Sequence, residues 1–259
     1  MATTVPKSAS LPLVRRLEAV SFRSWPAAKT VYDGTWALRL TAGHPAKRLN
    51  SLNPLDPGDN RDIGSRLARA ERLFESYDRP LILRASPLCP PELNEILDNR
   101  GWRTFDKTIV MTANLDGETE AVERVPLQDV GRWIDACVTM GEVDKAVKPG
   151  LRELISAVEG EVGLFLDEAD DGAPRAAAMA VRFGDLLGLF EIVTHPDARR
   201  AGHGRSIVAS AMQWGRSHGA RQAWLQVVAE NEAACALYAS MGFAPVYSYV
   251  YRQAASQIV

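Results

Sequence analysis

The segment Arg199-Arg200-Ala201-Gly202-His203-Gly204 constrains the fold of this 259-residue chain more than any other feature. It lies between a predicted strand over 186–194 and a predicted helix over 204–218. A helix N-terminus exposes backbone N–H groups without intrahelical partners and carries about half a positive charge. Glycine leaves room for a ligand to approach those amides. We therefore expect the loop to hold an anion such as a pyrophosphate, with Arg199 and Arg200 assisting.

Other motifs for nucleotide binding and hydrolysis do not fit the sequence. Ile207 stands where a dinucleotide-binding fingerprint has its third glycine, and no Gly-Lys-Ser/Thr of a Walker loop occurs. A Gly-x-Ser-x-Gly pattern runs from Gly215 to Gly219, but a helix is expected before Ser217 and a strand after it. A nucleophile elbow has the reverse order. His-Glu-x-x-His is also absent, so no metal is expected.

A second motif follows the strand predicted over 222–228 and reads Asn231-Glu-Ala-Ala-Cys-Ala-Leu-Tyr238-Ala-Ser-Met-Gly242-Phe243. Asn231 is a typical N-cap residue, and Gly242 is a typical residue for the end of a helix. Together they predict a helix over 232–241. Tyr238 lies next to the apolar stripe of this helix, so its hydroxyl is expected to reach the edge of the sheet.

Arg-x-x-Gly-x-Gly at 199–204, followed by Asn-x-x-Ala-x-x-Leu-Tyr-x-x-x-Gly-Phe at 231–243, resembles the GNAT superfamily of acetyl-CoA-dependent N-acetyltransferases. The resemblance covers roughly residues 120–259. It implies an α/β (α+β) fold with a mixed, mostly antiparallel central sheet flanked by helices. It also implies an acyltransferase that transfers the acetyl group of acetyl-CoA to a primary amine by direct attack. A non-catalytic acyl-CoA-binding regulatory module is the alternative.

The resemblance implies roles for the matching positions. The backbone amides of 201–206 would hold the CoA pyrophosphate, the strand 192–194 would pair with the pantetheine arm, and Tyr238 would protonate the departing thiolate. Glu191 is the expected general base and a water chain is the alternative. Gln226 stands where some ribosomal-protein alanine acetyltransferases of the family have a Glu. The expected cofactor-binding residues are Ile192, Val193, Thr194, Arg199, Arg200, Ala201, Gly202, His203, Gly204, Arg205, Ser206, Asn231, Ala234 and Tyr238.

The first half of the chain echoes the second in the order of its expected elements. A strand ends at Ser51-Leu52-Asn53-Pro54, and a helix over 62–77, a strand over 80–84 and a helix over 92–99 follow. Leu97 takes the place of Tyr238, and the acidic stretch 57–62 replaces the Gly-x-Gly loop. The arrangement resembles tandem GNAT proteins. It implies a degenerate GNAT-like domain over 1–117 and a catalytic GNAT domain over 118–259, with an unrelated cap domain as the alternative for the first half.

Further elements follow from periodicity and turn signals. Helices are expected over 10–24, 128–140 and 149–158, and strands over 35–41, 47–52, 108–112, 161–167, 175–183 and 244–252. The polar stretch 114–120 is the expected linker.

Composition narrows the partners. A formal net charge of −2 argues against nucleic-acid binding, and the absence of a run of about 18 apolar residues argues against a membrane span. Three widely spaced cysteines favour a reducing compartment and hence a cytoplasmic protein. Residues 1–50 carry a net charge of +6 and residues 151–200 a net charge of −5. Two solvated surfaces of opposite charge would explain this asymmetry. An acidic groove that receives a cationic small-molecule or peptide amine would explain it equally well. A homodimer is left open.

Overall fold

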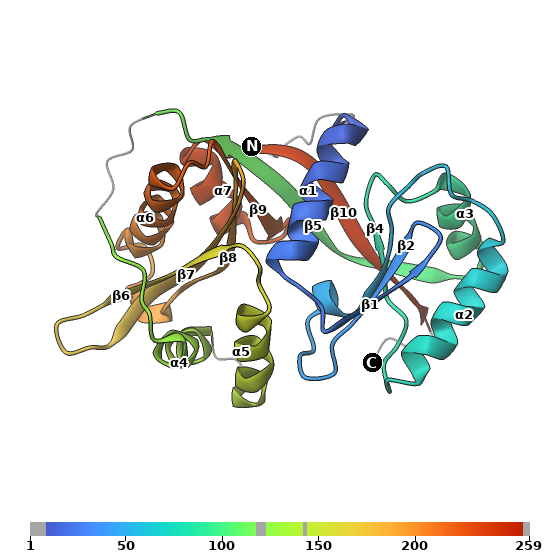
Figure 1. Cartoon of the computed structure of the whole chain (residues 1–259), viewed down its shortest axis with the longest axis horizontal. Helices are drawn as coiled ribbons and strands as arrows, with labels where there is room; N and C mark the ends of the chain where they lie inside the picture. The colour runs from blue at the N-terminus through green and yellow to red at the C-terminus, as the bar shows by residue number, and fades with distance from the viewer. Residues whose placement is uncertain (1–8, 118–122, 142–143, 256–259) are drawn as a thin grey trace. The chain divides into compact units, whose positions relative to one another are not determined.

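The computed structural model describes residues 9–117, 123–141 and 144–255, which form two compact units (Figure 1). Unit 1 takes in the chain up to Val110, the short stretch Val228–Glu230 and the residues from Pro245 onward. Unit 2 consists of Met111–Val227 and Asn231–Ala244. In each unit, helical structure is followed along the chain by three strands, a helix, a strand and a helix. The expected α/β fold, with a mostly antiparallel sheet flanked by helices, is confirmed.

Unit 1 is built on strands in the order β1-β2-β3-β4-β10-β5. Strands β3 and β4 are parallel, whereas β1 with β2, β2 with β3 and β4 with β10 are antiparallel. An apolar cluster in which Trp36, Phe74 and Leu97 are fully buried forms its core. The elements are α1 (Leu11–Ser24), β1 (Lys29–Asp33), β2 (Trp36–Leu40), β3 (Ser51–Pro54), α2 (Ile63–Glu75), β4 (Leu83–Ala85), α3 (Pro91–Asn99), β5 (Trp102–Asn114) and β10 (Ala244–Ala254).

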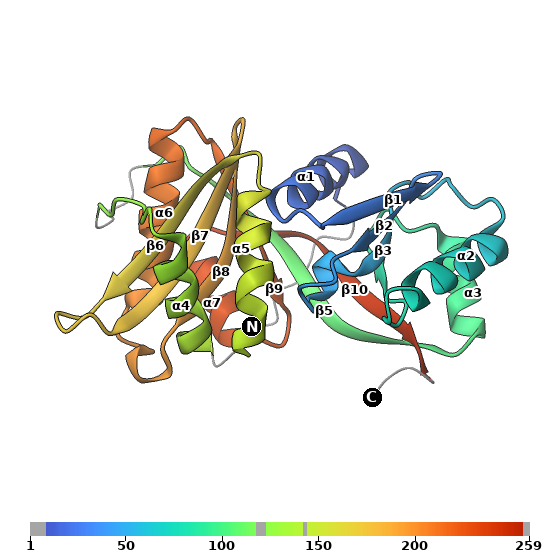
Figure 2. The same ribbon diagram turned by 60° about the horizontal axis from the view of Figure 1, so that its bottom comes forward.

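Unit 2 has the strand order β5-β9-β8-β7-β6, in which β8 and β9 are parallel and β7 is antiparallel to both its neighbours. Figures 1 and 2 show α4 and α5 on one face of its sheet and α6 on the other. The indole of Trp133 on α4 is buried and donates its Nε1–H to the carbonyl of Phe165 at 3.0 Å. The elements are α4 (Val130–Gly141), α5 (Lys148–Ser156), β6 (Glu161–Glu168), β7 (Pro174–Phe183), β8 (Leu186–Thr194), α6 (His203–Ser217), β9 (Gln222–Val228) and α7 (Glu232–Ser240).

Most of the expected elements are confirmed to within a few residues, and β8 and β9 coincide with the expected spans. The strand expected over 47–52 is wrong, because a 3₁₀ turn covers Lys47–Leu49 and β3 begins at Ser51. Asn50 explains this difference. Its side chain accepts from the amide of Thr41 at 2.8 Å and donates to the carbonyl of His44 at 2.7 Å. Such side-chain-to-backbone bonds compete with a strand ladder. The edge strand β1 was not expected, because most of its side chains are exposed and give little alternation. Strand β5 is longer than the 108–112 expected, and residues 118–120 of the expected linker lie outside the described residues.

Strand β10 belongs to unit 1, although the sequence-based division places it in the domain over 118–259. It pairs antiparallel with β4, with Tyr251 opposite Arg84. The buried hydroxyl of its Tyr247 donates to Glu18 Oε1 on α1 at 2.5 Å. Residues 111–114 at the end of β5 belong to unit 2, where β5 neighbours β9. The units therefore differ from a division at 117/118, because each contains a strand contributed by the other half of the chain.

This exchange predicts what happens when the chain is cut. A protease site inserted directly after Gly117 is expected, once cleaved, to leave two fragments that elute together in size-exclusion chromatography. Unit 1 needs β10 from the second fragment, and unit 2 needs the end of β5 from the first. Burying the three tyrosines Tyr247, Tyr249 and Tyr251 stabilises this association by roughly 1.5–3 kcal/mol each. The uncleaved insertion variant is the control, and fragments that separate while each stays folded would contradict the prediction.

Candidate active site

The parallel pairing of β8 with β9 ends part-way along both strands. It runs from Leu186 opposite Gln222 to Leu189 opposite Leu225. In the described part of the chain, no pairing between these two strands continues through residues 190–194 of β8 or 226–228 of β9. At residues 192–194 this edge of β8 is therefore not in the ladder with β9, and such a strand edge is a template for an added extended chain.

A β-bulge lies where the two strands part. On the other edge of β8, Phe190 pairs with Met179 and Val193 with Ala177, so two residues of β8 oppose one residue of β7. Glu191, the first of the two, has a φ of +46° in the left-handed region, which is unusual for a residue other than glycine. A bulge bends its strand and increases the local twist. This bend accounts for the separation of β8 from β9.

The loop after β8 leads into α6 through two left-handed residues. Arg200 has a φ of +63°, and Gly202, the N-cap residue of α6, has a φ of +87°. The amide of Ser206 donates to the carbonyl of Gly202 at 3.0 Å and so makes the first hydrogen bond of the helix. The amides of residues 203–205 precede that bond and have no helical partner. Of the backbone amides of 201–206 that were expected to bind an anion, the amide of Ser206 is not available, because it is hydrogen-bonded within the helix.

Gly204 brings three elements of the site together. A Cβ atom at this position would lie 3.0 Å from Thr194 Oγ1, at the end of β8, and 3.6 Å from Leu237 Cδ2 of α7. The glycine therefore allows the start of α6 to approach both neighbours. Glycine is favoured at position 202 for a different reason. A Cβ there would meet no atom within 4 Å, but the backbone has a positive φ, which glycine adopts without strain.

Helix α7 presents Tyr238 from a well-formed N-terminus. Asn231 Oδ1 accepts from the amide of Ala234 at 3.1 Å, which confirms the expected N-cap. Tyr238 is 6% exposed, and its ring packs edge-to-face against Phe243 with 6.0 Å between centroids. Burial raises the pKa of Tyr238 to about 12, and the neighbouring Cys235 adds to this rise. The phenol is therefore protonated across the neutral pH range.

Comparison with known proteins agrees with this geometry. Residues 13–252 match the family model described as "Probable histone acetyltransferase Rv0428c C-terminal". YobR of Bacillus subtilis, an uncharacterized N-acetyltransferase, is 24% identical over 92% of this chain and 98% of its own length. The [ribosomal protein bS18]-alanine N-acetyltransferase of Escherichia coli K12 is 33% identical over 37% of this chain and 64% of its own length. A GCN5-related N-acetyltransferase from Kribbella flavida has the same fold, with a TM-score of 0.68, 17% identity and coverage of 95% of this chain and 96% of that one.

The chain is a GNAT-family N-acetyltransferase. The family model spans most of its length and therefore includes both units. A GNAT assignment also makes it an acyltransferase. The glycine loop and the tyrosine on α7 are the features of this GNAT chain that the sequence motifs predict.

Glu191 lies on the bulge of this GNAT fold and is partly buried. Its charge acts on Cys137 of α4. Burial, with the Glu191 carboxylate as a further cause, raises the pKa of that thiol well above its usual range. Cys137 is consequently a neutral, buried thiol beside the carboxylate. The Glu191 carboxylate, the expected base, is therefore close enough to α4 to affect the thiol of Cys137.

The remaining expected binding residues are spread along the loop and the strand. Val193 and Thr194 pair with Ala177 and Ala176 of β7. Any added chain would therefore have to pair with the other edge of β8. The Arg205 guanidinium donates to Ser240 Oγ of α7 and is therefore engaged within the protein. Ile192 and Ala234 are half-buried, whereas Arg199, Arg200 and Ala201 are exposed.

One cluster under the loop was not expected from the sequence. The imidazole of His203, one of the expected cofactor-binding residues, lies with its Nδ1 2.8 Å from Asp167 Oδ2 on β6. Arg124, which precedes α4, donates to the other oxygen of the same carboxylate at 3.2 Å. These three residues come from distant segments, and no local spacing signals that they meet.

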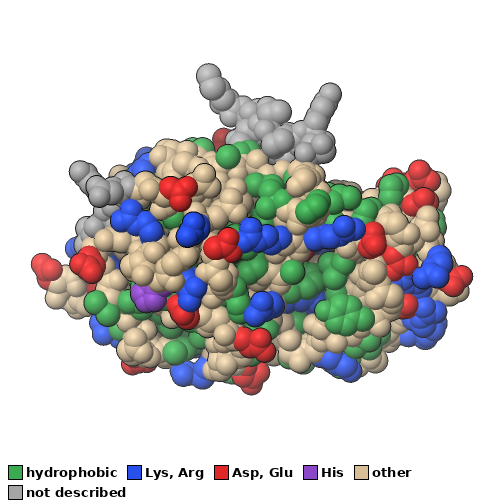
Figure 3. Space-filling model, turned by 45° about the horizontal axis from the view of Figure 1, so that its top comes forward, with side chains coloured by type: hydrophobic (Ala, Val, Ile, Leu, Met, Phe, Trp, Pro, Cys, Tyr) green, Lys and Arg blue, Asp and Glu red, His purple; other side chains and the backbone are tan. Residues whose placement is uncertain are grey.

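Part of the acidic charge over 151–200 is neutralised within unit 2. Besides Asp167, Glu161 pairs with Arg182 and Glu168 pairs with Arg132, and each of these pairs is partly exposed. Acidic and basic side chains are also interspersed on the face of the molecule drawn in Figure 3. Several acidic residues of the segment 151–200 are therefore neutralised by ion pairs and add no net charge to an acidic groove.

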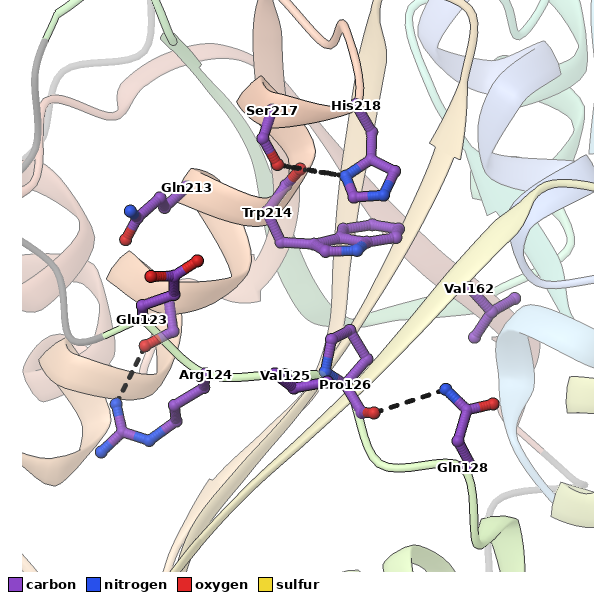
Figure 4. A pocket seen from close by; sticks show the side chains of 11 residues that line it. Glu123, Arg124, Val125, Pro126, Gln128, Val162, Gln213, Trp214, Ser217 and His218 are labelled. Atoms are coloured by element: carbon purple, nitrogen blue, oxygen red, sulfur yellow. Dashed lines mark hydrogen bonds between the residues drawn. The ribbon is translucent and has the colours of Figure 1, made fainter.

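A separate cavity of about 390 Å³ lies beside the C-terminal half of α6 (Figure 4). Trp214 contributes one wall, with the His218 ring 4.6 Å from it, and Pro126 lies nearby. The lining residues are Glu123, Arg124, Val125, Pro126, Gln128, Val162, Ser210, Gln213, Trp214, Ser217 and His218. The cavity is at the other end of α6 from the glycine loop and does not contain Tyr238 or Glu191.

Residues 9–117, 123–141 and 144–255 hold no cluster of three or more His, Cys, Asp or Glu side chains arranged to bind a metal ion. None of their helices has the length and apolar character needed to cross a bilayer.

The tight approach at Gly204 predicts a difference between two equivalent glycines. Gly204 and Gly64 are each the second residue of their helix, but a Cβ at Gly64 would meet only Arg100 Nη2 at 4.0 Å. Gly64→Ala is expected to be neutral or stabilising by up to about 1 kcal/mol. Gly204→Ala gains the same helix propensity but overpacks against Thr194, so its free energy of unfolding should be lower than that of Gly64→Ala by about 1–2 kcal/mol. Urea unfolding measures this difference, and equal values would contradict it.

Proposed function

We propose that this chain transfers the acetyl group of acetyl-CoA to a primary amine by direct attack. The observation that carries this proposal is the parting of β8 and β9 between the glycine loop and Tyr238. An extended thioester arm lying along residues 192–194 of β8 would bring its acyl group to the point where the strands separate. Edge pairing of this kind gives affinity through main-chain hydrogen bonds.

The residues of the glycine loop and of β8 fit the diphosphate and the pantetheine arm of acetyl-CoA. Near Gly202, the space that a Cβ would occupy is open to 4 Å, and the amides of 203–205 have no helical partner. A diphosphate would accept hydrogen bonds from amides of 201–205, where the helix dipole favours negative charge. Ile192, Val193 and Thr194 would receive the pantetheine arm. Arg199 and Arg200 are exposed and would add positive charge at the mouth of the loop.

Tyr238 is the proposed general acid. Attack of the amine on the acetyl carbonyl forms a tetrahedral intermediate, and its collapse breaks the C–S bond. The developing thiolate then takes the phenolic proton of Tyr238. A buried tyrosine with a pKa of about 12 is a weak acid in water, but the same desolvation also raises the pKa of a buried thiolate. The two changes partly offset each other, and the phenol stays fully protonated before the reaction.

Glu191 is the proposed general base. It is the carboxylate at the bulge, next to the proposed acyl position, and it lies near enough to Cys137 to contribute to the raised pKa of that thiol. The base would take the proton that the amine must lose before or during attack. The left-handed φ of Glu191 fixes where the side chain leaves the strand.

The proposed acceptor is the amine of a peptide or protein. The matching family is described as a histone acetyltransferase family, and the Escherichia coli relative is named for an alanine of a ribosomal protein. Both names describe amines on polypeptides. Small-molecule amines are the alternative, and a panel of peptides and small amines followed by mass spectrometry would separate the two.

We further propose that unit 1 is a degenerate GNAT-like copy that does not bind the donor. Its helix α2 has Asp62, with a φ of +50°, at the N-cap position that Gly202 occupies on α6. Asp59 of the preceding loop is held by Arg66 Nη1 at 2.9 Å and by the amide of Thr35 at 2.9 Å. The hydrogen bond from Arg66 lowers the pKa of Asp59 to about 2, so the carboxylate stays ionised and engages the guanidinium that lies nearest this loop, in place of a diphosphate.

Removing the Tyr238 hydroxyl tests the proposed general acid. Tyr238→Phe is expected to lower kcat by about 10²–10⁴-fold, the usual contribution of general acid–base catalysis, while the acetyl-CoA Kd stays within about threefold. CoA release with a reactive amine gives kcat, and isothermal titration gives Kd. Tyr32→Phe, which removes the hydroxyl of an exposed tyrosine, is the control. Because the pKa is raised, wild-type kcat should show no loss from tyrosine ionisation up to about pH 10.

Two outcomes would contradict the proposal in different ways. Full activity in Tyr238→Phe would remove the acid role alone. Tight acetyl-CoA binding by the wild type without turnover of any amine would favour an acyl-CoA-binding regulatory module.

The base is tested by Glu191→Gln, which keeps the size of the side chain and removes its charge. We expect kcat/KM for the amine to fall by about 10²-fold at neutral pH, with the acetyl-CoA Kd unchanged. Glu232→Gln, at an exposed carboxylate in the first turn of α7, is the control. Activity within threefold of wild type would instead assign the proton transfer to a water chain.

A further inference from the structure

Five side chains join the first half of α6 to β6 and to the segment that precedes α4. Arg124 Nη1 donates to Ser206 Oγ at 2.8 Å and to Ser210 Oγ at 2.9 Å. Its Nη2 donates to Asp167 Oδ1 at 3.2 Å, and Asp167 Oδ2 lies 2.8 Å from His203 Nδ1. The carboxylate thus has one oxygen for the guanidinium and one for the imidazole. We call Arg124, Asp167 and His203 the loop-anchoring network.

This network is better shielded than the other ion pairs of β6. The side chains of Arg124, Asp167 and His203 are 18%, 12% and 23% exposed. The next residue on the strand, Glu168, pairs with Arg132, whose side chain is 52% exposed. Exposed ion pairs are screened by water and salt, whereas shielded, charge-assisted hydrogen bonds hold their geometry more firmly. The loop-anchoring network is therefore better able than the Glu168–Arg132 ion pair to hold the start of α6 in one position.

The network acts on the first turn of α6. His203 is the first residue of the helix, and Ser206 and Ser210 lie about one and two turns further along. The loop just before it contains the left-handed residues Arg200 and Gly202. Small rotations at such residues re-aim the amides that follow. Fixing His203 and Ser206 to β6 holds the direction in which the amides of 203–205 point.

Resting on the function proposed above, we propose that Arg124, Asp167 and His203 are positioning residues for diphosphate binding. They hold the amides of the glycine loop in the orientation that accepts the diphosphate of the acyl donor. Asp167 accepts from Nδ1 of His203, so this nitrogen carries the proton and the ring orientation is fixed. The network touches neither the thioester nor the amine, so its effect belongs to donor binding and not to acyl transfer.

Asp167→Asn separates positioning from charge, because the two predict opposite signs. Removing a carboxylate near a diphosphate lowers electrostatic repulsion, so charge alone would tighten binding of acetyl-CoA. Loss of positioning would weaken it. We expect the acetyl-CoA Kd of Asp167→Asn to rise about tenfold by isothermal titration. The Kd for S-acetylpantetheine, which has the thioester arm but no diphosphate, should stay within twofold.

Matched variants complete the experiment. Glu168→Gln, on the same strand, is the control and should leave both affinities unchanged. His203→Asn retains a side-chain N–H close to the position of Nδ1 and should keep most of the acetyl-CoA affinity, whereas His203→Ala should behave like Asp167→Asn. These two variants alter a partly exposed position, so they also serve if Asp167→Asn does not fold.

The possible results decide the proposal. Unchanged or tighter acetyl-CoA binding in Asp167→Asn would overturn it. An equal loss for acetyl-CoA and S-acetylpantetheine would overturn it too, because a general loss of structure would then account for the effect. Weak binding by His203→Asn as well as His203→Ala would show that the imidazole contacts the ligand itself. If the wild type binds neither compound, the proposed function fails, and this result is distinct from the others.

Discussion

The candidate site depends on where β8 and β9 stop pairing. Two neighbouring parallel strands normally share hydrogen bonds along their common length, but the bulge at Glu191 bends β8 after Leu189 and ends the ladder there. The loop that follows β8 leads into α6, and α7 follows β9. The parting of two strands therefore sets the places of the anion-binding loop and of Tyr238. Gly204 keeps the two helices and the end of β8 in contact.

The sequence predicts the parts of this site that obey local rules. Asn231 is a typical N-cap residue, and its side chain accepts the capping hydrogen bond of α7 in the structure. The ends of β8 and β9 are set by residues within a short window and are predicted correctly. The left-handed φ of Glu191 has no such signal, because a glutamate in a strand gives no sign of a bulge.

Features that join distant segments are not predictable in this way. The contacts of Arg124 with Asp167, and of Asp167 with His203, depend on the pairing of strands and helices far apart in the chain. The place of β10 has the same cause. Its apolar and aromatic pattern predicts a strand, but it does not say which strands are its neighbours, and these are β4 and β5.

The exchange of β5 and β10 has a consequence for synthesis on the ribosome. The sheet of unit 1 is incomplete until the residues of β10 have left the exit tunnel, although its first strand emerges near residue 29. The first half of the chain must wait in a partly folded state until the residues of unit 2 and β10 have been synthesised. A nascent chain of this kind exposes the edge of β4 throughout that time, which makes it a client for chaperones that shield unpaired strand edges.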